Sequence, residues 1–151
     1  MSFYTFTAVA ALAGAVSSMI IGVIWYGPLF GKKWGKVIGM PTGENLSKAE
    51  MMAMQKALIP TYLANFLASF VQYFALGFFA ALIGGLTISG ALLYAVFIWL
   101  GFVVPVLAGI ALWSGKSKKV GWMMFGISVG YQLVALLAGG VIWAFLYANL
   151  G

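Results

Sequence analysis

Four polar side chains lie at regular spacing within a long apolar run near the middle of the chain: Thr61, Asn65, Ser69 and Gln72. At 100° per residue they fall within an arc of about 80°, so a helix would carry them on one face. Amides that face lipid are costly, so this face should meet another helix or a wet cavity. It therefore predicts either hydrogen bonds between helices or a site for a small polar ligand.

A second, weaker polar face occurs in the last apolar run. Ser128 and Gln132 share a narrow arc there, and Tyr131 stands beside them. Together the two faces are the candidate intramembrane polar site, which serves either a ligand or helix packing. Because no lysine, glutamate or histidine lies within the apolar runs, we do not expect proton coupling through a buried charge.

The residue types that most enzymes need are missing from the chain. It has no Asp, Arg, His or Cys, and its two acids, Glu44 and Glu50, lie in one polar segment. Without His and Cys we expect no metal centre, haem, iron–sulfur cluster or disulfide. Without Asp and His there is no Ser-His-Asp arrangement. The sequence therefore predicts a protein that is not an enzyme and binds no cofactor.

The composition predicts an integral membrane protein. Of 151 residues, 64% are hydrophobic and 7% are charged, and the mean hydropathy is +1.09. A water-soluble surface needs about 25–35% charged residues, so this chain cannot cover itself for water. The net charge of +6 comes from lysines beside the apolar runs. Lipid headgroups explain these lysines better than nucleic acid, so we expect the bilayer as a partner and no nucleic acid.

The apolar runs predict an all-α fold, a bundle of four transmembrane helices in one integral membrane domain over residues 1–151. We expect the helices to form two hairpins with a weak internal pseudo-repeat, in which Trp25 and Trp113 each close an odd-numbered span before lysines. All eight lysines lie in the first and third connections, which we expect on the cytoplasmic side, with both termini periplasmic or extracellular. The predicted spans are residues 3–29, 61–85, 90–113 and 121–148, and the cytoplasmic connections are residues 30–60 and 114–120.

The first connection contains a signal for a helix start. Ser47 followed three residues later by Glu50 matches a capping box, so a short helix should begin at Lys48. We expect this helix to lie along the cytoplasmic interface. Pro60 should then bend the chain into the second span, because proline disrupts a helix interior.

Small residues mark two candidate packing faces, which allow the backbones of neighbouring helices to approach closely. In the third span, Pro105 has no N–H to donate to the carbonyl of Gly101, so we expect a kink there. The packing face of the first span comprises Ala10, Gly14, Ser18 and Gly22, and that of the third span comprises Gly101, Pro105 and Gly109.

The segment Ile24–Lys36 marks the point where the first span leaves the membrane. Gly27 and Pro28 favour a helix end. Amphipathic aromatic rings and lysines follow, which are typical of an interfacial anchor that fixes the depth of a helix. A docking surface for a lipid or a partner is the alternative. The predicted anchor residues are Trp25, Tyr26, Lys32, Lys33, Trp34 and Lys36.

The sequence WYGPLFGKKW in this segment resembles the signature of a bacterial family of small multi-pass membrane proteins, catalogued as domain of unknown function 1761. The resemblance extends over most of the chain, including the Leu112–Trp113 exit from the third span. It implies a four-helix protein of the inner membrane. It implies no activity, substrate or catalytic residue.

Three functional hypotheses follow from these residues. The favoured one is a non-enzymatic helix bundle that assembles with itself or serves as an accessory subunit of a larger membrane complex. The alternative is a small transporter, pore or binder for an apolar or weakly polar molecule, built on the two polar faces. A pigment or quinone site is the weakest hypothesis, because the chain has no His to act as a ligand.

Overall fold

The protein is a helical bundle, and the predicted all-α fold with four membrane-length helices is confirmed. The computed structural model describes residues 2–40, 47–83 and 87–150. The predicted end of the second span at residue 85 and the acid Glu44 lie outside these residues. In chain order the elements are α1 (Phe3–Ile24), η1 (Trp25–Leu29), α2 (Gly31–Ile38), α3 (Lys48–Leu82), α4 (Ile88–Ile98), η3 (Trp99–Val103), α5 (Val104–Leu112) and α6 (Lys118–Leu150).

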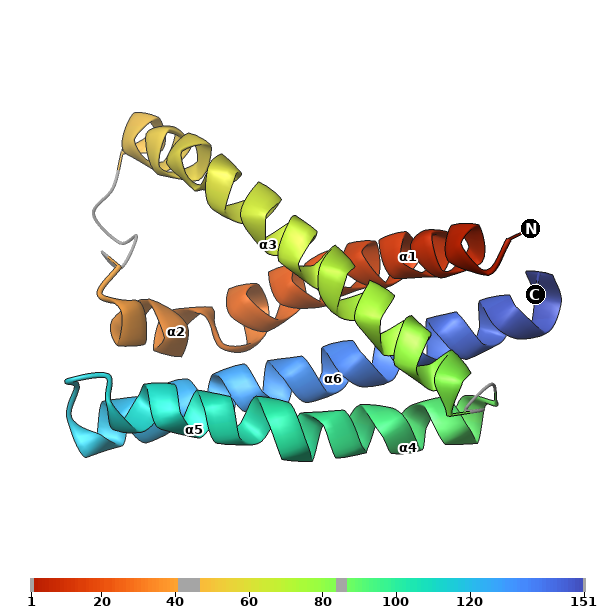
Figure 1. Ribbon diagram of the computed structural model, residues 1–151. Helices are drawn as coiled ribbons and strands as arrows, with labels where there is room; N and C mark the ends of the chain where they lie inside the picture. Colours follow the sequence, from red (N-terminus) through yellow and green to blue (C-terminus); the bar gives the residue numbers. More distant parts are fainter. Residues whose placement is uncertain (1, 41–46, 84–86, 151) are drawn as a thin grey trace.

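Helix α6 is the centre of the bundle. It packs against α1 and against the continuous helix formed by α4, η3 and α5 (Figure 1). Helix α3 crosses α1 obliquely, so that its last turns lie near α4 while its first turns project away from the other helices (Figure 1). Both termini lie at the same end of the bundle. The helices therefore converge at the end that holds the termini and diverge at the other end (Figure 1).

Small side chains dominate the core, because a bundle without water between its helices depends on close backbone approach. Ala11, Ala15 and Ala95 are completely buried. The first core cluster comprises Ala11, Ala15, Tyr73, Leu76, Ala95 and Leu136, and the second comprises Phe6, Ala10, Ala80 and Trp143.

Two π-helical turns interrupt the first and third spans. The turn η1 contains Pro28, and η3 ends two residues before Pro105. A proline removes one helical hydrogen bond and its ring crowds the preceding turn, and a wider π turn relieves that crowding. The structure thus has a π turn where the sequence predicts a kink at Pro105.

The helix predicted to begin at Lys48 does begin there, but it does not stop at the interface. Ser47 caps it, and the reciprocal capping box with Glu50 is present. The predicted change at Pro60 from a short helix to a separate span is wrong, because α3 continues through this residue to Leu82. The short helix of the first connection is instead α2, whose left-handed C-terminal residue Gly39 ends it. Pro60 has no N–H to donate to the carbonyl of Lys56, four residues earlier. Because Pro60 is exposed, this part of α3 is not enclosed by other helices.

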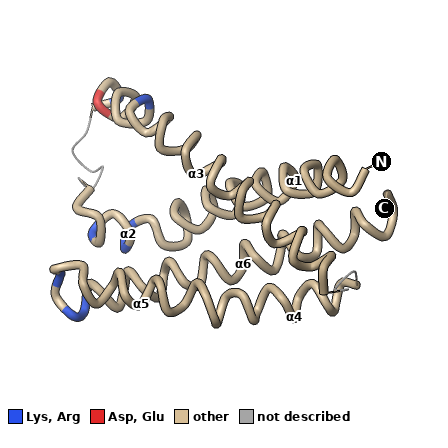
Figure 2. The backbone as a smooth tube through the Cα atoms, viewed as in Figure 1, with Lys and Arg blue, Asp and Glu red and all other residues tan. Residues whose placement is uncertain are grey.

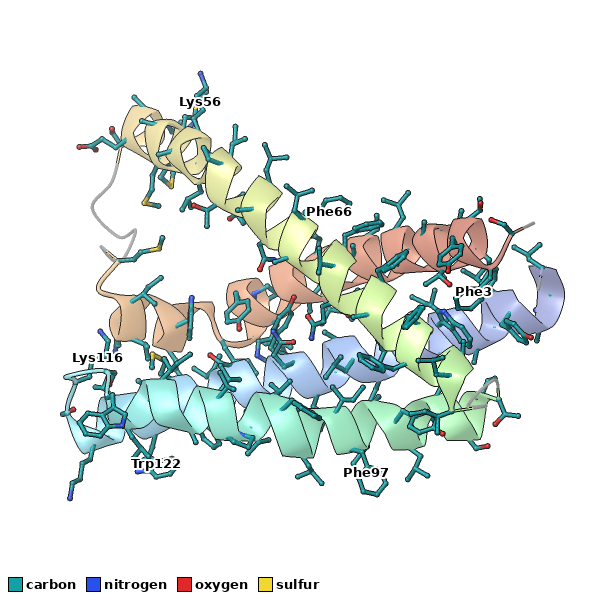
Figure 3. All side chains as sticks on the ribbon, in the orientation of Figure 1. Phe3, Lys56, Phe66, Phe97, Lys116 and Trp122 are labelled. Carbon is teal, nitrogen blue, oxygen red and sulfur yellow. The ribbon has the colours of Figure 1, made fainter. Side chains whose placement is uncertain are left out.

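The charged side chains of the described residues gather at one end of the bundle (Figure 2). They come from α2, from the start of α3 and from the connection between α5 and α6, whereas the end that holds the termini shows none (Figure 2). Lys56 and Lys116 lie near this charged end, and Phe3 lies at the opposite one (Figure 3). The long sides of the bundle expose large apolar residues such as Phe102 and Val71. This distribution fits a multi-pass membrane protein.

Candidate functional site

Tyr73 of α3 lies in a slot between two glycines on other helices. A Cβ atom at Gly14 of α1 would lie 2.8 Å from the ring, and one at Gly139 of α6 would overlap it. The Tyr73 hydroxyl donates a hydrogen bond of 2.7 Å to the carbonyl of Ala135. One side chain thereby joins α3, α1 and α6. Ser69, one turn earlier on the predicted polar face, is also buried.

Tyr131 of α6 makes the reciprocal contact with α1. It packs against Gly22, and its hydroxyl donates to the carbonyl of Ser18 at 3.1 Å. The Ser18 hydroxyl in turn donates to the Ala15 carbonyl of its own helix at 2.8 Å. Thus Gly14, Ser18 and Gly22 all face partner helices, and Ala10 of the same predicted face is 3% exposed.

Gln72 and Gln132 bring the two predicted polar faces together. The Gln72 amide donates to the Gln132 carbonyl oxygen over 3.4 Å, and both side chains are partly buried. Ser128 lies one turn before Gln132 and is half-buried. Both side chains are neutral amides. They can hold the two helices together or bind a neutral ligand, but they cannot take up a proton as a carboxylate or imidazole does.

The indoles of two π-helical turns donate to neighbouring carbonyls of α6. Trp25 Nε1 donates to the Ile127 carbonyl at 3.0 Å, and Trp99 Nε1 donates to the Val129 carbonyl at 2.8 Å. Trp113, the predicted counterpart of Trp25 in the internal pseudo-repeat, is 90% exposed. The first and third spans therefore resemble each other through Trp25 and Trp99, each the first residue of a π turn.

Thr61 and Asn65 lie apart from the other polar residues. Both are exposed, on the part of α3 that projects from the bundle. The Asn65 amide donates to Met19 Sδ at 3.5 Å, and thioether sulfur is a weak acceptor. The predicted polar face of the second span is therefore divided between an exposed half and a packed half.

The predicted anchor residues lie around η1 and α2. Tyr26 contacts both Trp34 and Tyr131, with ring centroids 4.8 Å and 5.1 Å apart respectively. The lysines of this segment are exposed. Trp25 has a packing role as well, because a Cβ atom at Gly130 would lie 2.9 Å from its indole. The exposed anchor lysines are Lys32, Lys33 and Lys36.

Among the described residues, no other helix lies against Gly101 and Gly109 of the packing face predicted for the third span. A Cβ atom at Gly101 or Gly109 would meet nothing within 4 Å, and Pro105 is exposed. The reason is that α4, η3 and α5 contact α6 through other residues, including Ala91, Ala95 and Ala111. The small residues of this face point away from α6.

The residues that sequence reasoning missed are aromatic donors. Tyr73 and Trp99 were assigned no role, yet each donates to a backbone carbonyl of α6. Such a residue could be recognised only by pairing the tyrosine or tryptophan with a glycine or a carbonyl on another helix. A single sequence does not show which distant positions are neighbours.

Comparisons with known proteins give one family and no individual relative. The family model described as "Protein of unknown function (DUF1761)" matches residues 9–144 of the chain. No curated protein and no solved structure matches significantly.

Proposed function

The chain belongs to the DUF1761 family of proteins of unknown function, and from this premise we propose that it is a non-enzymatic membrane protein whose helix bundle assembles with itself. Residues 48–68 of α3 carry the proposal. None of them is buried, and the first buried residue of the helix is Ser69. A membrane helix with no buried residue over this length has surface available for another subunit.

Asn65 is the polar group that this arrangement leaves poorly satisfied. Nine residues separate it from Lys56, which at 1.5 Å per residue places it about 13 Å further along the helix. If Lys56 lies at headgroup level, the Asn65 amide is then within the hydrocarbon, where a polar group without good partners is costly. If the α3 helices of two copies packed side by side, the Asn65 amide of each copy would have the Asn65 amide of the other as its hydrogen-bond partner.

The packed polar residues support assembly rather than transport. Gln72 is paired with Gln132, and the hydroxyls of Tyr73 and Tyr131 both donate to carbonyls. Groups that satisfy one another between helices stabilise the bundle and leave few free partners for a solute.

The placement in the cell is part of the same proposal. The lysine-bearing end faces the cytoplasm by the positive-inside rule, which places both termini on the periplasmic or outer side of a bacterial inner membrane. Reporter fusions at each terminus test this orientation, and termini inside the cell would contradict it.

Disulfide cross-linking tests the assembly, because the chain has no cysteine of its own. Ala68→Cys places a thiol one turn from Asn65, and Val106→Cys is the control on an exposed part of α5. We expect oxidation in native membranes to give covalent dimers with Ala68→Cys and not with Val106→Cys. Adding Asn65→Leu should lower the dimer yield about three-fold, the effect of a hydrogen bond of about 0.6 kcal/mol. Equal yields from the two cysteine variants would refute the proposal.

A further inference from the structure

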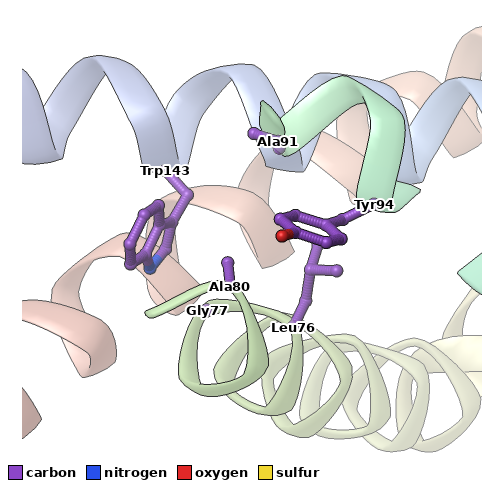
Figure 4. Close-up of a pocket in the computed structure, with 7 residues that line it drawn as sticks. Leu76, Gly77, Ala80, Ala91, Tyr94 and Trp143 are labelled. Carbon is purple, nitrogen blue, oxygen red and sulfur yellow. The ribbon is translucent and has the colours of Figure 1, made fainter. Parts of the chain in front are cut away.

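Trp143 of α6 differs from the other buried aromatic donors. It is 3% exposed, and its indole N–H has no hydrogen-bond partner among the described residues. The ring lies against Gly77 of α3, so closely that a Cβ atom at Gly77 would overlap Nε1 (Figure 4). A buried donor without an acceptor is costly. The indole N–H of Trp143 is therefore available to a hydrogen-bond acceptor from outside the described chain.

A small cavity adjoins this indole, between α3, α4 and α6. Its volume is about 10 Å³, which is close to the minimum for one water molecule. Besides Gly77 and Trp143 its walls are Leu76, Ala80, Ala91, Tyr94 and Gly140. A buried water needs two to four polar partners, and these walls are mostly apolar. This space has room for a single acceptor atom, and the carbonyl oxygen of an otherwise apolar molecule suits its walls better than a water does.

A larger apolar groove lies beside the cavity. Its volume is about 640 Å³, within the range of small-molecule sites. The groove and the cavity share Leu76, Ala80 and Tyr94 as walls. The side chains of Phe79 and Phe97 on its walls are 54% and 63% exposed, and Phe97 points outward from α4 (Figure 3). The groove is thus open on the side that faces lipid.

The depth of Trp143 matches that of a lipid ester. Helix α6 has 33 residues and is about 50 Å long, which exceeds the hydrocarbon thickness of about 30 Å by about 10 Å at each end. Trp143 lies seven residues before the final residue, Leu150, or about 10 Å from that end. It is therefore at the boundary of the hydrocarbon, where the acyl carbonyls of phospholipids lie. The end concerned is the one that holds the chain termini.

We propose that this site binds one ester-linked phospholipid, whose acyl carbonyl accepts the hydrogen bond from Trp143 Nε1 while the acyl chain lies in the groove between α3 and α4. The carbonyl supplies the missing acceptor, and the chain covers the apolar walls. The site uses the packed half of α3. The binding is therefore independent of assembly through residues 48–68, and each proposal can fail without the other.

Two lipids that differ only at the carbonyl test the site. The purified protein is titrated in detergent with dioleoyl phosphatidylglycerol or with its diether counterpart, which lacks the ester carbonyls, and native mass spectrometry counts the retained lipid. We expect the wild type to bind one diester lipid about ten-fold more tightly than the diether lipid. Trp143→Phe should remove this preference, because it keeps the ring and loses the donor.

A second variant covers the case in which Trp143→Phe does not fold. Ala75→Phe fills the groove at a wall that does not line the cavity, and it should abolish retention of either lipid. Val106→Phe, on an exposed part of α5, should bind as the wild type does. Equal affinity of the wild type for the two lipids would overturn the proposal and indicate a buried water. Occupation by a second copy would also overturn it and would appear as a dimer that Ala75→Phe dissociates.

Discussion

The two halves of α3 have opposite surroundings, and the charged residues of this helix, Lys48, Glu50 and Lys56, all lie in the first half. Residues 48–68 contain no buried side chain, whereas residues 69–82 place Ser69, Tyr73, Leu76, Gly77 and Ala80 in the core. The halves differ in what the neighbouring helices present to them. The second half meets glycines on α1 and α6 that accept its tyrosine, and the first half meets no such surface. Apolar character thus places a helix in a membrane, and complementary shape decides where it packs.

The largest expected loss of stability comes from filling the slot in which the Tyr73 ring of α3 lies. Gly139→Ala places a methyl group where the Tyr73 ring now lies, so the ring must leave its slot and lose its hydrogen bond. We expect a loss of about 3 kcal/mol in the free energy of unfolding, measured in mixed micelles by titration with a denaturing detergent. Gly126→Ala is the control, because its Cβ would meet nothing within 4 Å and should cost no stability.

A matched pair of leucines on α3 tests the contrast between its halves directly. Leu76 is 7% exposed and Leu63 is 61% exposed. Leu76→Ala should leave a cavity and cost about 2 kcal/mol, whereas Leu63→Ala should change the unfolding free energy of the monomer by less than about 0.5 kcal/mol. The measurement is the same detergent titration, at protein concentrations low enough to keep the chain monomeric. Equal costs would show that the first half is also packed within one subunit.

A matched pair of tyrosines isolates one hydrogen bond. Tyr73→Phe removes the donor to the Ala135 carbonyl and keeps the ring in its slot, so we expect a loss of about 1 kcal/mol. Tyr62→Phe, on the exposed half of the same helix, should have no measurable effect. If Tyr73→Phe is also neutral, the ring alone joins the three helices.

The part of the fold that the sequence predicts well depends on local composition. The ends of the first span, Phe3 and Leu29, agree with prediction, because hydropathy follows from consecutive residues. The capping box at Ser47 and Glu50 is equally local. The continuity of α3 through Pro60 was not predicted, because a proline signal does not show whether the surrounding structure ends the helix there.

The candidate site was predicted only in part. The pairing of Gln72 with Gln132 joins two faces that the sequence had identified separately. Gly101 and Gly109 have open space beside them within the described chain, so their predicted packing role stays a prediction, since periodicity identifies a face of a helix but not its neighbour. The sequence could not show that Trp143 Nε1 has no acceptor among the described residues, because this depends on how three helices pack together.

The sequence by itself determined that the chain forms four apolar helices, that its lysines are confined to the connections at one end, and that it lacks the ionisable groups of common catalytic sites. These properties depend on residue types and on their order along the chain. Only the tertiary structure decided that Tyr73 lies between Gly14 and Gly139 and that residues 48–68 of α3 contain no buried side chain. The physical reason is that helix contacts in a membrane depend on shape and hydrogen bonding between distant residues, while hydrophobicity is nearly the same on every face.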